Sequence, residues 1–123
     1  MNDILLYSAA AIIALWGTAH LWATGGAVKG FGELTADNRR IITMEWIVEG
    51  VALISTAAVV VAATAIQREA AVSSAVYAVA VGTLIVLAIV SLFTGFRIAF
   101  LPFRLCPFIF GLSAVLIAVG AWL

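Results

Sequence analysis

The sequence predicts an all-α, polytopic membrane protein with four transmembrane helices in an up-down-up-down bundle. Of the 123 residues, 66% are hydrophobic and only 10% are charged, whereas about a quarter of the residues in soluble domains are charged. Four apolar segments approach or exceed the roughly 20 residues that a helix needs to cross a bilayer. Short links between them favour antiparallel neighbouring helices, and we expect a single transmembrane domain over residues 1–123.

The first two helices are expected at residues 4–24 and 39–66. No Lys or Arg precedes the first apolar run, which makes it a poor match to a cleaved signal peptide, so we interpret it as a retained transmembrane helix. It is expected to end at Gly25-Gly26, because glycine tolerates the positive φ found at helix ends. Three candidate N-cap residues stand before or at the start of the second helix: Thr35, Asp37 and Asn38.

The third and fourth helices are expected at residues 71–97 and 106–123. Pro102 is expected to prevent a regular helix through the following turn, since proline lacks a backbone N–H and its ring clashes with the preceding turn. Pro107 fits the first turn of the fourth helix. Strands are disfavoured, because the apolar runs lack the period-two alternation of a membrane barrel.

Charge predicts the orientation of the chain and excludes one class of partner. The first and third links carry five of the six basic residues, and only Arg68 lies in the second. By the positive-inside rule, we expect both termini outside a bacterial or archaeal plasma membrane, with the helices in contact with the lipid bilayer. The formal net charge of zero leaves no basic surface for nucleic acid.

Glu45 and Glu49 lie one turn apart inside the second apolar run. A carboxylate in hydrocarbon costs at least a few kcal/mol unless it is paired, hydrated or protonated, so it marks a candidate functional site. Repulsion between the two favours one of them holding a proton, and Glu49, which lies deeper, is the better candidate. In the alternative interpretation, Arg39, Arg40 or Arg97 neutralises the glutamates in a purely structural network.

His20 is the third candidate catalytic residue beside Glu49 and Glu45. Histidine exchanges protons near neutral pH, and His20 is expected in the same half of the bilayer as the glutamates. The alternative is a structural histidine hydrogen-bonded to an adjacent helix. One imidazole and two carboxylates are suitable metal ligands, but no HxxH or ExxH pairing supports such a site, so we predict no metal, and the sequence identifies no cofactor.

Aromatic and polar residues near this cluster form the predicted ligand site. Trp16 and Trp46 neighbour His20 and the glutamates, and we expect them to wall a pocket for a lipophilic small molecule. Arg97 is expected to polarise an oxygen of that molecule. The predicted ligand-binding residues are Trp16, Trp46, Ser91, Thr94 and Arg97.

Three functions remain open from the sequence. The preferred one is an acid–base enzyme, isomerase-like or oxidoreductase-like, or a binder of a lipophilic molecule. The second is a proton-coupled small transporter or channel that works as a homo-oligomer, and the third is an accessory subunit of a larger membrane complex. A stripe of small residues permits close helix approach within the bundle or between subunits: Gly111, Ala114, Ala118 and Ala121.

Overall fold

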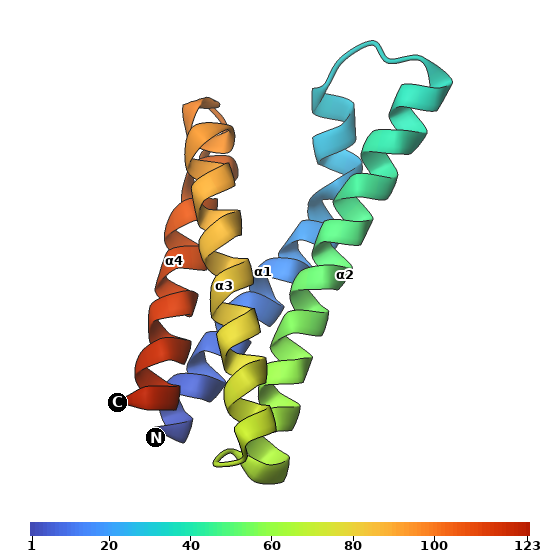
Figure 1. The fold of residues 1–123 in the computed structure, drawn as a ribbon. Coiled ribbons are helices and arrows are strands. Elements are labelled where there is room, and N and C mark those ends of the chain that lie inside the picture. Colours follow the sequence, from blue (N-terminus) through green and yellow to red (C-terminus); the bar gives the residue numbers. More distant parts are fainter.

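The computed structural model describes all residues from 1 to 123, and its regular structure is helical throughout (Figure 1). The all-α prediction is therefore confirmed. The model contains four helices that are long and apolar enough to cross a membrane, the third of them counted through Arg97. In chain order the elements are α1 (Asp3–Gly30), α2 (Ala36–Gln67), α3 (Ala71–Phe93), the 3₁₀ turn η1 (Gly95–Arg97) and α4 (Leu101–Trp122).

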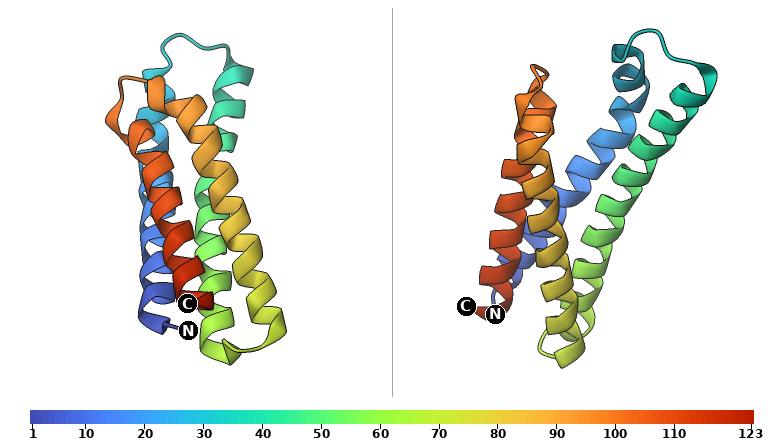
Figure 2. Two further views of the ribbon diagram at one scale, coloured as in Figure 1. Left: turned by 60° about the vertical axis from the view of Figure 1, so that its left-hand side comes forward. Right: turned by 45° about the horizontal axis from the view of Figure 1, so that its top comes forward.

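The helices form two hairpins that diverge toward one end of the molecule. In the ribbon views, α1 lies beside α2 and α3 lies beside α4, and both termini lie at the end where the hairpins come together (Figures 1 and 2). The link between α1 and α2 and the link between α3 and α4 lie at the opposite end, where the hairpins separate. The molecule therefore has a packed end, where the two hairpins come together, and a splayed end, where the two hairpins separate from each other.

Helix α1 continues beyond its predicted end. The prediction that Gly25-Gly26 terminates it is wrong, because the helix runs to Gly30. Glycine in a helix costs only about 1 kcal/mol relative to alanine, and burial of Val28 in the last turns favours the longer helix. The chain turns instead around Gly32, whose φ of 76° is the only positive φ in the protein.

The start of α2 was predicted well and the start of α4 was not. The Thr35 hydroxyl accepts a hydrogen bond from the Asn38 N–H at 3.2 Å and caps α2. Helix α4 begins at Leu101 instead of residue 106, so Pro102 lies in its first turn and Pro107 lies in its interior. A first-turn proline forfeits no helical hydrogen bond, so the prediction that Pro102 prevents a regular helix is wrong, and Pro102 takes the place predicted for Pro107.

All four helices contribute to one apolar core. The largest fully buried side chains include Tyr77 and Phe110. The Tyr77 and Thr64 hydroxyl oxygens lie 3.0 Å apart, and this buried hydrogen bond joins α3 to α2. Because an unpaired buried hydroxyl is costly, the bond also fixes how the two hairpins meet.

The Tyr77→Phe substitution is expected to lower the free energy of unfolding by about 1 kcal/mol, the usual net contribution of one hydrogen bond. Thr64 keeps its bond to the Val60 carbonyl at 2.8 Å, so no buried hydroxyl is stranded. Denaturant titration of the detergent-solubilised protein measures the loss. Tyr7→Phe is the matched control, since Tyr7 is exposed; equal losses in the two variants would contradict the assignment.

Polar contacts connect helix ends at the packed end of the molecule. Asp3 at the start of α1 forms an ion pair with Arg68 after α2. The hydrogen bond and negative charge of Asp3 raise the pKa of Arg68 above its ordinary value, so its guanidinium stays charged at every working pH. Trp122 Nε1 also donates to the Ser74 hydroxyl at 3.0 Å. These contacts join the start of α1 to the end of α2 and the start of α3 to the end of α4.

Candidate functional site

Two glycines bring α1 and α2 into close contact. A Cβ atom on Gly17 would lie 2.8 Å from the Gly50 carbonyl oxygen, and one on Gly50 would lie 2.6 Å from Cδ2 of Leu21. Only glycine therefore fits at either position without a shift of its neighbours. His20 lies one turn beyond Gly17 on α1, and Glu49 directly precedes Gly50 on α2, so this close crossing positions both side chains.

The predicted residues His20 and Glu49 meet between the two helices. Nε2 of His20 lies 3.3 Å from Oε2 of Glu49, within ion-pairing distance but without the alignment of a hydrogen bond. The His20 side chain is 9% exposed and that of Glu49 is 44% exposed. The imidazole also stacks on the Trp46 ring, with a centroid distance of 4.1 Å and an interplanar angle of 14°. Glu49 and Trp46 thus contact the His20 imidazole on two sides.

The two ring nitrogens of His20 have different surroundings. Nε2 is buried against Glu49, whereas Nδ1 makes no hydrogen bond and is not among the buried unpartnered atoms. A carboxylate beside one nitrogen favours the tautomer that carries its proton there. The other nitrogen then has a free lone pair, so the arrangement suits Nδ1 to act as a proton acceptor.

An aromatic-lined cavity of about 350 Å³ adjoins this histidine. Trp16, His20 and Trp46 line it from α1 and α2, and Phe103 closes it from α4, with its ring edge on Trp46 at a centroid distance of 5.7 Å. Nε1 of Trp16 is buried without a hydrogen-bond partner. The thiol of Cys106 contacts this indole, but sulfur is a weak acceptor. The cavity is therefore apolar except for the ring nitrogens of one histidine and three tryptophans, none of which makes a strong hydrogen bond: His20, Trp16, Trp22 and Trp46.

The remaining predicted site residues lie outside this cavity. Glu45 is exposed and makes no ion pair or side-chain hydrogen bond. The Thr94 hydroxyl donates to the Val90 carbonyl at 2.7 Å. Because α3 ends at Phe93, Arg97 lies in the separate turn η1, where it is exposed and forms no ion pair with either glutamate. The predicted site residues absent from the cavity wall are Glu45, Glu49, Ser91, Thr94 and Arg97, although Glu49 contacts His20 behind the wall.

The α4 wall of the cavity was not predicted. This wall is formed by Phe100, Leu101 and Phe103. Because the fourth helix was predicted to begin at residue 106, these residues were not expected to lie against α1. Phe100 and Phe103 contact each other at a centroid distance of 5.7 Å. The density of aromatic residues around Pro102 was the one signal in the sequence that pointed to this wall.

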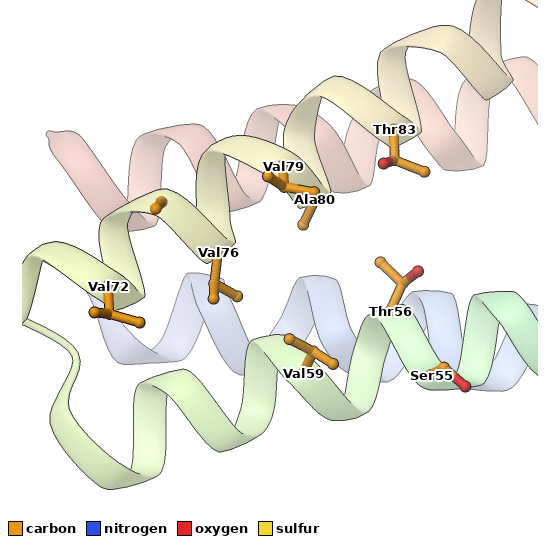
Figure 3. Close-up of a pocket in the computed structure, with 9 residues that line it drawn as sticks. Ser55, Thr56, Val59, Val72, Val76, Val79, Ala80 and Thr83 are labelled. Carbon is orange, nitrogen blue, oxygen red and sulfur yellow. The ribbon is translucent and has the colours of Figure 1, made fainter.

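A second groove lies between α2 and α3, with a volume of about 440 Å³ (Figure 3). Val59 and Thr56 of α2 face Val76 and Thr83 of α3 across it. The Thr56 hydroxyl is already bonded to the Ala52 carbonyl at 2.9 Å. No ionisable side chain lines this groove, so it lacks the acid–base groups of the His20 cavity.

Comparisons with protein-family models, with curated proteins and with solved structures find no match to this chain. No group of three or more His, Cys, Asp or Glu side chains lies close enough together to hold a metal ion. The fold and site define a four-helix protein, apolar enough to cross a membrane, with one histidine beside an aromatic-lined cavity.

Proposed function

We propose that this protein crosses the membrane with its four helices and binds a lipophilic small molecule that carries an oxygen atom. The His20 cavity supports this proposal, because it combines apolar aromatic walls with the buried, unpartnered Nε1 of Trp16. Nε1 is buried beside the Cys106 thiol, so a rotation of the indole toward the cavity would let a ketone or similar oxygen accept the hydrogen bond that Nε1 lacks. Burial of an apolar ring against Trp46 and Phe103 would supply most of the binding free energy.

We further propose that the bound molecule undergoes proton transfer at a carbon next to its carbonyl group. Nδ1 of His20 removes the proton, the C–H electron pair forms a C=C bond, and the carbonyl electrons move onto oxygen. Trp16 Nε1 donates to that oxygen as negative charge develops. When the substrate is a β,γ-unsaturated ketone, return of the proton from Nδ1 to the γ carbon moves the C=C bond into conjugation with the carbonyl and completes an isomerisation. Glu49 is a positioning residue that stabilises the positive imidazolium through Nε2.

The proposed orientation places the site within reach of the bilayer. The helices run up-down-up-down across a bacterial or archaeal plasma membrane, with both termini outside and the basic first and third links in the cytoplasm. His20 then lies on the cytoplasmic side of the hydrocarbon core. A lipophilic substrate reaches the cavity from the lipid without passing through water.

A matched pair of probes tests the proposed binding. Methyl naphthyl ketone and ethylnaphthalene have nearly the same shape, but only the ketone can accept a hydrogen bond. We expect the ketone to bind the detergent-solubilised protein about fivefold more tightly, since one hydrogen bond contributes about 1 kcal/mol. Equilibrium dialysis measures both affinities. The preference should disappear in Trp16→Phe; equal affinities in the unmodified protein would remove the proposal.

Exposure of the glutamates supports a second candidate, a proton-coupled transporter that works as a homo-oligomer. Glu45 is exposed and the Glu49 side chain is 44% exposed, so a second copy could shield both from lipid. On the small-residue stripe of α4, Ala114 and Ala121 are buried within the chain, which leaves Gly111 and Ala118 for such a contact. Proton flux into proteoliposomes that is lost in Glu49→Gln would favour this candidate, whereas a strictly monomeric protein would count against it.

A further inference from the structure

A second cavity of about 340 Å³ adjoins the His20 cavity at the splayed end of the molecule. Residues of the last turns of α1 form one wall, and the segment just before α4 forms the other. Phe100 and Phe103 line both cavities. The two cavities therefore meet at this pair of aromatic rings, which forms part of the wall of each. The remaining residues that line the second cavity are Gly26, Ala27, Gly30, Phe31 and Ile98.

The shape of the second cavity depends on two glycines. Gly26 and Gly30 lie one helical turn apart on α1, and a Cβ added to either would meet no atom within 4 Å. Neither glycine is required by a close helix contact, in contrast to Gly17 and Gly50. The missing side chains leave open volume that a larger residue would fill.

We propose that the ligand of the His20 cavity is elongated, with its oxygen-bearing ring beside His20 and an apolar extension in the Gly26–Gly30 cavity. This inference rests on the proposed function. His20 and Gly30 are ten residues apart, which corresponds to about 15 Å along the helix. The second cavity is lined by no charged side chain, so it accepts hydrocarbon and offers no partner for an ionic group. Gly26 and Gly30 thereby set the length of ligand that binds.

Two probes and two variants test this inference. The short probe is methyl naphthyl ketone, and the long probe carries a hexyl chain on the ring far from the carbonyl. In Gly26→Leu the new side chain occupies the second cavity, and we expect affinity for the long probe to fall about tenfold, since about two CH₂ groups lose their burial. Affinity for the short probe should stay within about twofold. Equilibrium dialysis provides the affinities of both probes for the unmodified protein and for each variant.

Gly25→Leu is the matched control, because Gly25 is exposed, has the same open surroundings and does not line the cavity. It should leave both probes unaffected. Three results would overturn the inference: an unchanged affinity of Gly26→Leu for the long probe, an equal loss for both probes, or the same loss in Gly25→Leu. If the short probe fails to bind the unmodified protein, the proposed function fails as well, which distinguishes that failure from the others.

Discussion

Replacement of Glu49 by Gln is expected to slow proton transfer at the bound ketone by about 100-fold, the lower range for loss of acid–base assistance. The reaction to follow is exchange of the methyl protons of methyl naphthyl ketone in heavy water, which requires removal of a proton beside the carbonyl. Glutamine keeps the shape of the side chain 3.3 Å from His20 but removes the negative charge that stabilises the imidazolium. Mass spectrometry of the recovered ketone gives the exchange rate.

The affinity for the ketone separates this role of Glu49 from a purely structural one. We expect Glu49→Gln to bind the probe within about twofold of the unmodified protein, because Glu49 does not line the cavity. Glu45→Gln is the matched control: Glu45 lies one turn away, is exposed and makes no contact with His20. Equal slowing in both variants, or a loss of affinity that accounts for the whole effect, would contradict the assigned role.

Replacement of Gly17 by Leu is expected to lower the free energy of unfolding by about 3 kcal/mol, at the upper end for overpacking. Even a Cβ atom at this position would lie 2.8 Å from the Gly50 carbonyl oxygen and 2.9 Å from Cγ1 of Ile54. A backbone atom cannot rotate away, so α1 and α2 must separate. The separation would also move His20 from Glu49 and abolish ketone exchange.

Denaturant titration in detergent measures this destabilisation. Gly82→Leu is the control, since a Cβ on Gly82 of α3 meets nothing within 4 Å and replacement of a helical glycine favours the helix by about 1 kcal/mol. We therefore expect opposite signs for the two variants. A stable Gly17→Leu protein with normal exchange would show that the close crossing of α1 and α2 does not position the site.

Local patterns in the sequence predicted the central pair of the site. The helical spacing placed Glu45 and Glu49 one turn apart on the second helix. Depth along the helices then put His20 and Glu49 at a similar level, and the structure brings them within 3.3 Å. The role of Gly50 in the close approach of α1 and α2 was not predicted, because it depends on which helix packs against this glycine.

Features that depend on packing between distant segments were not predicted. Proline chemistry allowed either Pro102 or Pro107 in the first turn of α4, and only the contact of Phe103 with Trp46 shows which turn reaches α2. Arg97 was expected beside the glutamates because the third helix was extended through it. The break after Phe93 places Arg97 in a separate turn, where its guanidinium is exposed.

Photolabelling with benzophenone tests the central claim most directly. On illumination its carbonyl oxygen abstracts a hydrogen atom from a nearby C–H bond, and the two carbon radicals then combine, which marks the residues around a bound ketone. We predict adducts on the wall of the His20 cavity, between Trp16 and Ala23 or between Phe100 and Leu105, and their loss in the presence of excess methyl naphthyl ketone. Adducts confined to the groove around Val59 and Val76, with none at the His20 cavity, would contradict the account.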